Sequence, residues 1–240
     1  MAENDSRRIL AIHAHPDDVE FQCAGTLAIL KQKGCHVTIA TMTPGDCGSA
    51  EHDAEEISRI RRSEAGKAAE LMGADYICLE FRDLSIVVDN ESRRRVCEII
   101  RRVKPDIVLT APPVDYMTDH EVTSVLVREA CFNASVPNYL TKQWDPAPPT
   151  HRIPELYYVD PLEGADWYGQ PQPFDFIIDI SSTYEIKKKM LACHDSQRSW
   201  LRKQHGIDEY LDKAERGGPA RGRWGAFKNG QPSPHHTGLP

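Results

Sequence analysis

The segment Ala14-His15-Pro16-Asp17-Asp18 brings an imidazole next to two adjacent carboxylates. It follows the apolar run at residues 9–12 and precedes a stretch of helical pattern, so it lies where a strand ends and a helix begins. Open α/β folds bind their ligands in the crevice at this end of the strands. Histidine and carboxylate side chains together suit a divalent metal such as zinc, and a second carboxylate can activate a metal-bound water. The pattern therefore predicts metal-assisted chemistry at this turn.

The same segment resembles the AHPDD signature of the PIG-L/LmbE-like family of zinc-dependent N-deacetylases. A simple turn with a helix cap is the alternative, because Pro and Asp are common in turns and caps. The place at the end of the first strand and the following Ala24-Gly25-Thr26, similar to the family's Gly-Gly-Thr, favour the family pattern. The resemblance implies that His15 and Asp18 bind zinc and that Asp17 is the general base.

The third zinc ligand in the family is the histidine of a later Asp-His pair at a helix start, which Asp119-His120 matches. Alone, such a histidine is more often a solvated or locally bonded residue. The interpretation of His120 as a ligand is favoured here because the first motif supplies only two ligands and leaves a third position open. Two imidazoles and one carboxylate leave the fourth coordination position open for water, as a catalytic zinc site requires. We expect one zinc ion per chain, with another divalent metal as the alternative.

Three further residues match family positions outside the metal motifs. Arg61, in Arg61-x-x-Glu64, matches an arginine that contacts substrate hydroxyl or phosphate groups; an (i, i+3) surface ion pair is the alternative. Asp83 matches an aspartate that binds sugar hydroxyls, and a turn aspartate is the alternative. His194 stands in a segment similar to the family's late Lys-x-x-x-Leu-x-x-His-x-Ser-Gln helix and is expected to approach the active site.

One position departs from the family pattern. Many members carry His-Pro-Asp-His, where the first histidine helps to stabilise the oxyanion, but this chain has Met117-Thr118-Asp119-His120. Methionine cannot donate a hydrogen bond, and loss of one oxyanion donor costs about 10²–10³ in rate. Either another side chain supplies the missing donor, with His194 as the candidate, or the activity is slow or altered. His13 is the alternative, because it points to the same strand face as His15.

Apolar, β-branched runs alternate with segments of helical period, which indicates a parallel sheet wrapped by helices. The fold class predicted is α/β, a Rossmann-like, mostly parallel twisted sheet with helices on both faces. The expected strands are residues 8–14, 36–41, 76–79, 107–110, 156–159 and 174–180, and the expected helices are residues 26–33, 55–72, 92–103 and 183–205. The proline-rich residues 133–153 are predicted to form a surface excursion that shapes the pocket rim.

Length and composition place this site in one domain. We expect a single domain over residues 1–240, with a core at about 8–205 and an irregular C-terminal tail after residue 215. The net charge of −7 without a basic stripe argues against nucleic acid as a partner. The first apolar stretch is too short for a signal peptide or a membrane span, and the seven scattered cysteines form no Cys-x-x-Cys pair, so a cytoplasmic protein is expected.

The resemblance implies a hydrolase that removes the N-acetyl group from an N-acetylglucosamine-type sugar or sugar conjugate and releases acetate. Two alternatives stay open: an amidase that acts on a larger amide conjugate, and a catalytically silent metal- or sugar-binding homologue. Asp17 argues against the silent alternative, because a mere binding protein has no use for a base there. The exact substrate does not follow from the sequence, and a homo-oligomer is one of the open states of assembly.

Overall fold

The computed structural model describes residues 6–161, 164–205 and 224–229. Its seven strands are β1 (Arg8–His13), β2 (His36–Thr41), β3 (Asp75–Cys78), β4 (Ile107–Thr110), β5 (Glu155–Val159), β6 (Phe176–Asp179) and β7 (Trp224–Asn229). Its α-helices are α1 (Asp18–Gln22), α2 (Ala24–Gln32), α3 (Ala54–Met72), α4 (Asn90–Val103), α5 (Thr118–Asn133), α6 (Tyr184–Ala192) and α7 (Asp195–His205), with a 3-10 turn η2 (Ser181–Thr183) before α6. Within these residues no helix has the length and apolarity to cross a membrane.

The strands form one sheet in the order β3-β2-β1-β4-β5-β7-β6. Strands β1 to β5 run parallel to their neighbours, and β7 pairs antiparallel with both β5 and β6. The sheet is therefore mostly parallel, as predicted. Strand β1 pairs with β2 on one side and β4 on the other, so the strand order reverses between β1 and β4. This reversal is the topological switch point at which open α/β sheets bind ligands.

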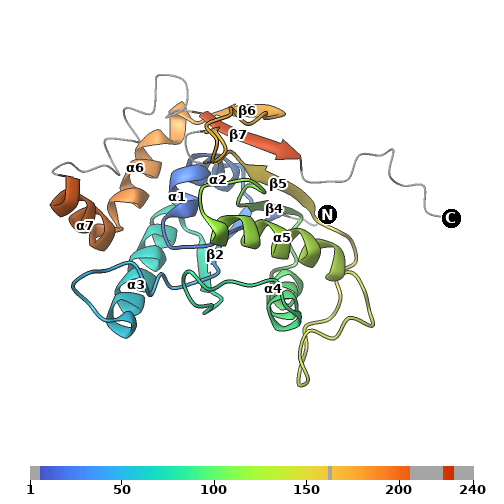
Figure 1. Cartoon of the computed structure of the whole chain (residues 1–240). Helices are drawn as coiled ribbons and strands as arrows, with labels where there is room; N and C mark the ends of the chain where they lie inside the picture. Colours follow the sequence, from blue (N-terminus) through green and yellow to red (C-terminus); the bar gives the residue numbers. More distant parts are fainter. Residues whose placement is uncertain (1–5, 162–163, 206–223, 230–240) are drawn as a thin grey trace.

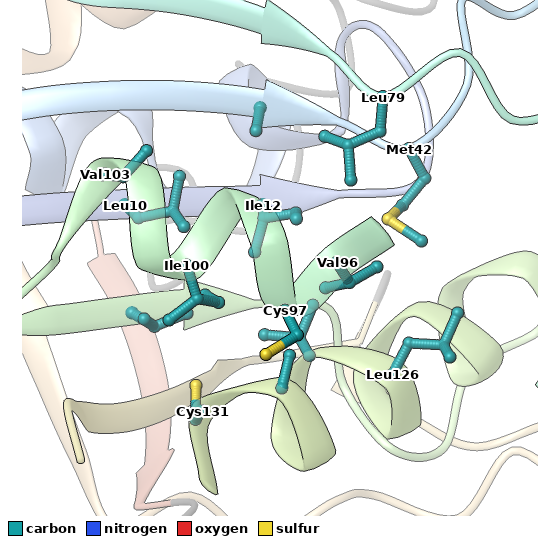
Figure 2. Packing of buried hydrophobic residues seen from close by; sticks show 14 of the residues in the cluster. Leu10, Ile12, Met42, Leu79, Val96, Cys97, Ile100, Val103, Leu126 and Cys131 are labelled. Atoms are coloured by element: carbon teal, nitrogen blue, oxygen red, sulfur yellow. The ribbon is translucent and has the colours of Figure 1, made fainter. Parts of the chain in front are cut away.

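Helices cover both faces of the sheet, because the residues of β1 alternate between two apolar clusters. Leu10 and Ile12 pack with residues of α4 and α5, such as Ile100 and Leu126, and Figure 2 shows these side chains meeting between strand and helices. The intervening residues of β1 pack on the other side against α1, α2, α3 and α6. This two-faced burial fits a central parallel strand that is apolar on both sides.

Strand β7 corrects the prediction of an irregular tail after residue 215. Figure 1 shows it, in red, between β5 and β6. Phe227 is buried and stacks on Phe176 with ring centroids 5.5 Å apart. The sequence Trp224-Gly225-Ala226-Phe227-Lys228-Asn229 has no β-branched residue and contains Gly and Ala, which have low strand propensity. Pairing on both edges, which no local pattern reveals, explains the strand.

The helix predicted at residues 183–205 is broken in the structure. Helix α6 ends at Ala192, and α7 begins at Asp195 with a change of direction that is visible in Figure 1. The first turn of α7 is capped by Glu64 of α3, whose carboxylate accepts the Ser196 amide at 2.8 Å and the Ser196 hydroxyl at 2.7 Å. The break leaves His194 between the two helices and directs its ring into the protein interior.

The proline-rich segment after α5 is irregular, as predicted, but it lies away from the pocket rim. Helix α5 begins near the carboxyl end of β4 and runs about 24 Å, at about 1.5 Å per residue, to Asn133. The buried Arg101 side chain then donates to the carbonyls of Ala134 at 3.1 Å and Val136 at 2.7 Å. Because the segment leads back to the amino end of β5, it borders the opposite edge of the sheet.

Candidate active site

Three side chains from two turns meet at the switch point between β1 and β4. Nδ1 of His15, which follows β1, lies 3.3 Å from Nε2 of His120 in the first turn of α5. The Asp18 carboxylate lies 3.3 Å from the same His15 nitrogen and 3.4 Å from the same His120 nitrogen. Both imidazoles are almost fully buried. The residues predicted as metal ligands are thus brought together.

The triangle formed by these atoms fits a zinc ion. A tetrahedral zinc site with bonds of about 2.0–2.1 Å has neighbouring ligand atoms about 3.3–3.4 Å apart. The separation of the two ring nitrogens falls at this spacing, and so do their distances to the Asp18 carboxylate, which presents Oδ2 to His15 and Oδ1 to His120. Two ring nitrogens that face each other also need a proton or a cation between them, since two bare lone pairs repel. His15, Asp18 and His120 therefore offer the donor atoms that a divalent cation requires.

The far nitrogens of both rings are held by buried carboxylates. Nε2 of His15 lies 2.9 Å from Oδ1 of Asp83, and Nδ1 of His120 lies 3.1 Å from Oδ1 of Asp115. A metal-binding histidine usually donates its other N–H to such a carboxylate, which sets the tautomer and the ring orientation. A second group of possible ligands, His15, Asp83 and Asp119, uses this far nitrogen of His15. We interpret Asp83 and Asp119 as residues that orient the His15 ring, because their carboxylates already accept hydrogen bonds from main-chain amides.

The electrostatics of the cluster follow from buried opposite charges. Burial alone would lower the pKa of His120, but the charges of Asp18 and Asp115 raise it to about 10. His15 behaves likewise: burial opposes its charged form, and hydrogen bonds to Asp119, Asp18 and Asp83 raise its pKa well above the ordinary value. Burial would raise the pKa of Asp18, but His120 and His15 hold it well below its usual range. Without a cation, the cluster retains protons that a metal would replace.

Asp17 occupies a strained turn beside this triangle. Its φ of 100° lies in the left-handed region, which costs a residue with a Cβ roughly 1–2 kcal/mol. Arg61 of α3 holds the turn in place: its Nη2 donates to the Pro16 carbonyl at 2.8 Å and to Oδ2 of Asp17 at 3.2 Å. Strained residues that the surroundings fix in this way cluster at functional sites. Asp17 is buried and directly precedes Asp18, one of the predicted metal ligands.

A sequence profile described as PIG-L, GlcNAc-PI de-N-acetylase, matches residues 10–131, a stretch that contains the whole triangle. The chain belongs to the PIG-L family. The PIG-L match covers both motifs that supply the predicted zinc ligands, and Asp17, Arg61 and Asp83 as well.

Relatives in the PIG-L family carry more than one activity. The chain is 28% identical to diacetylchitobiose deacetylase of Thermococcus kodakarensis over 81% of this chain and 71% of that protein. It is 25% identical to 4-oxalmesaconate hydratase of Pseudomonas putida over 78% of this chain and 73% of that protein. The structure of N,N'-diacetylchitobiose deacetylase from Pyrococcus horikoshii, complexed with an inhibitor, matches with a TM-score of 0.73 and 25% identity over 93% of this chain and 84% of that chain.

Two residues for which the PIG-L resemblance predicts substrate contacts also contact other residues of the site. The guanidinium of Arg61 is buried against Pro16, Asp17 and the Gly45 carbonyl, and it pairs with Asp17. Asp83 is also buried, with one oxygen at His15 and the other accepting the Cys47 amide at 3.2 Å. These contacts give both side chains a positioning role, and their contacts to substrate stay predictions.

The structure also does not place His194 at the oxyanion. Its side chain is completely enclosed, and its Nε2 lies 3.4 Å from Oε1 of the buried Glu20. Burial would lower the pKa of His194, but the charge of Glu20 raises it. His13, the alternative donor, is fully buried too, and burial lowers its pKa to about 4. A ring without exposed surface cannot touch a substrate that enters from solvent.

The sequence analysis did not identify the carboxylates that contact the two predicted ligand histidines. Asp115 lies in the loop that carries His120, five residues before it, and Asp119 directly precedes it. Asp119 accepts the Leu84 amide at 2.7 Å and lies 3.4 Å from Nε2 of His15. The available signal was the density of acidic residues around one histidine, which is a common pattern of metal sites with supporting carboxylates.

Proposed function

We propose that this chain is a zinc-dependent N-deacetylase that removes acetyl from an N-acetylglucosamine-type sugar or sugar conjugate. The observation that carries the proposal is the triangle of His15, Asp18 and His120, whose donor atoms are spaced as zinc ligands are. Deacetylases among the PIG-L relatives support the substrate class.

The side chains of the site have different roles in the proposed reaction. His15, Asp18 and His120 would hold the ion, which when bound polarises the acetamide carbonyl and makes a water molecule more acidic. Asp17 takes the proton from the attacking water as the new C–O bond forms, since a carboxylate is a suitable general base. Asp17 then returns this proton to the nitrogen as the C–N bond breaks, and acetate and a free amine leave.

Arg61 makes this proton transfer geometrically possible. A general base must lie within hydrogen-bond reach of the proton that it accepts. The turn at Asp17 is strained, and the Arg61 guanidinium fixes it through the Pro16 carbonyl and the Asp17 carboxylate. The enclosed position also keeps Arg61 in one orientation. Arg61 therefore acts on the reaction through Asp17.

The test is acetate release by the zinc-loaded protein from N-acetylglucosamine and from diacetylchitobiose. Asp17→Asn should retain zinc and lose at least about 10²-fold in kcat, because the amide keeps the shape of the carboxylate but cannot accept the proton. His120→Ala should lose most of its zinc, because it removes one of three ligands. Full zinc occupancy in His120→Ala would contradict the metal site, and an Asp17→Asn enzyme with normal kcat would contradict the base.

Two alternative activities need to be tested in parallel, each with its own substrate. Hydration of a carbon–carbon double bond is a second candidate, because the hydratase of Pseudomonas putida aligns over nearly as much of this chain as the deacetylase does. A larger amide conjugate is the other. Turnover of an unsaturated tricarboxylate such as 4-oxalmesaconate, or of a bulky amide but not of N-acetylglucosamine derivatives, would replace the deacetylase proposal with one of these.

A further inference from the structure

The amide reaction needs a hydrogen-bond donor near the substrate carbonyl, and Met117 does not supply one. Met117 precedes α5, where its main-chain carbonyl accepts the amides of His120 at 3.1 Å and Glu121 at 3.3 Å. The backbone of Met117 thus begins the helix that carries His120, but its thioether side chain has no hydrogen to donate. His194 and His13 are enclosed in the protein interior, so the exposed side chains beside the site are the next candidates for a donor.

Tyr116, directly before Met117, is exposed at the edge of the metal triangle. Its side chain is 64% exposed, and its ring meets the His120 ring edge-on, with centroids 5.6 Å apart and planes at 84°. Among the residues that the structure describes, its hydroxyl has no hydrogen-bond partner. The edge contact with the His120 ring places the Tyr116 side chain beside one of the proposed zinc ligands.

The backbone on both sides of Tyr116 is held by hydrogen bonds, although the Tyr116 residue itself is largely exposed. The Asp115 carboxylate lies 3.1 Å from His120 and accepts the Met117 amide at 3.3 Å, and the Asp115 amide donates to Glu121 at 3.1 Å. The residues on both sides of Tyr116 are thus bound to the helix that carries the ligand. A side chain on such an anchored loop can reach a bound substrate without movement of the metal ligands.

We propose that the hydroxyl of Tyr116 replaces the missing donor and hydrogen-bonds to the acetamide oxygen as that oxygen becomes negative. This inference rests on the proposed deacetylase function. When water adds to the carbonyl carbon, the π electrons move to the oxygen, and Tyr116 donates a hydrogen bond to it without transferring its proton. When the C–N bond breaks, the carbonyl reforms, the amine receives its proton from Asp17, and Tyr116 releases the oxygen.

The first test compares Tyr116→Phe with Tyr157→Phe, both zinc-loaded. The control hydroxyl bonds to Glu155 at the amino end of β5, remote from the switch point. Tyr116→Phe should lower kcat about 10²–10³-fold, with little change in KM and unchanged zinc content, as expected for one oxyanion donor. Tyr157→Phe should keep kcat. Tyr116→Phe, Met117→His should regain part of the loss, because histidine restores a donor at the neighbouring position.

The second test measures binding by calorimetry, without turnover. The probe is glucosamine whose amine carries a methylphosphonyl group, because its tetrahedral oxygens imitate the charged intermediate. Tyr116→Phe should bind this probe at least about 10-fold more weakly than wild type, while affinity for glucosamine stays unchanged. Normal kcat and normal probe affinity in a folded, zinc-loaded Tyr116→Phe would overturn the inference and leave the deacetylase proposal intact. Wild-type protein that releases no acetate would instead overturn the function itself.

Discussion

The carboxylate of Asp115 lies 3.1 Å from Nδ1 of His120, on the ring nitrogen opposite the one that faces His15. The same arrangement recurs at Asp83 and His15, at 2.9 Å. Each imidazole is therefore held between a buried carboxylate and the other imidazole. The orientation of both rings depends on carboxylates outside the proposed ligand set.

Asp115→Asn should weaken zinc binding about 10–100-fold, because an amide no longer orients and polarises the His120 ring as a carboxylate does. Competition with a chromophoric chelator measures the affinity. Asp195→Asn is the matched control, since its carboxylate is 78% exposed on α7. Equal zinc affinity in the two variants would remove the supporting role of Asp115.

Gly45→Ala should lower kcat, because the added methyl group displaces the Arg61 side chain. A Cβ at Gly45 would overlap the Arg61 guanidinium, which must then move away from Asp17. Gly34→Ala separates this effect from backbone strain: φ is +73° at Gly45 and +88° at Gly34, but nothing lies within 4 Å of a Cβ at Gly34. Both variants should lose about 1 kcal/mol of stability. If the two enzymes show the same kcat, Arg61 does not position the base.

Zinc binding should release protons and strengthen with pH. In the metal-free protein the pKa of His120 is raised to about 10 and that of His15 is also raised, so both rings hold protons at neutral pH. The cation binds the deprotonated rings, and affinity should therefore rise by up to about 10²-fold per pH unit, until the pH passes these pKa values. Calorimetry in two buffers of different ionisation enthalpy counts the protons. Binding without proton release would show that the rings are neutral in the metal-free state.

His194→Ala should act on stability and not on the oxyanion. The side chain is enclosed against Glu20, and removing one member of a buried charged pair costs about 3–5 kcal/mol. Because the pKa of His194 is raised in the folded protein, its stabilisation is complete below the ordinary histidine pKa of about 6.5 and is lost as pH rises through the raised value. Thermal unfolding of both proteins at pH 6 and pH 9 should show a smaller difference at pH 9. A normal Tm with a lower kcat would favour the oxyanion role instead.

Much of the parallel half of the fold follows from the sequence. The predicted strands at residues 36–41 and 107–110 coincide with β2 and β4, because each is a short apolar run bounded by a glycine or proline turn. Strand β7 and the break before α7 could not be predicted. Both depend on partners distant in the chain: β7 on two neighbouring strands, and α7 on the cap from Glu64.

The same distinction between local patterns and distant contacts applies to the site. The meeting of His15, Asp18 and His120 follows from two motifs at adjacent strand ends, although their binding of zinc stays a prediction. The contacts that Arg61 and Asp83 make within the site did not follow from the sequence, because a residue's type and position in a motif do not show which way its side chain points; their substrate contacts stay predictions. In this chain both point inward, toward Asp17 and His15.

The place of β7 also affects the order of events during synthesis. Among the strands that the structure describes, β6 pairs only with β7, and β5 has β7 on its outer edge. While a ribosome adds the residues between Asp179 and Trp224, both strands have emerged or are emerging with an unpaired edge. Unpaired edges are templates for pairing with other chains. Nascent or truncated chains that end before Trp224 therefore carry two open edges, and loss of one short strand near the C-terminus should cause aggregation long before it affects the metal site.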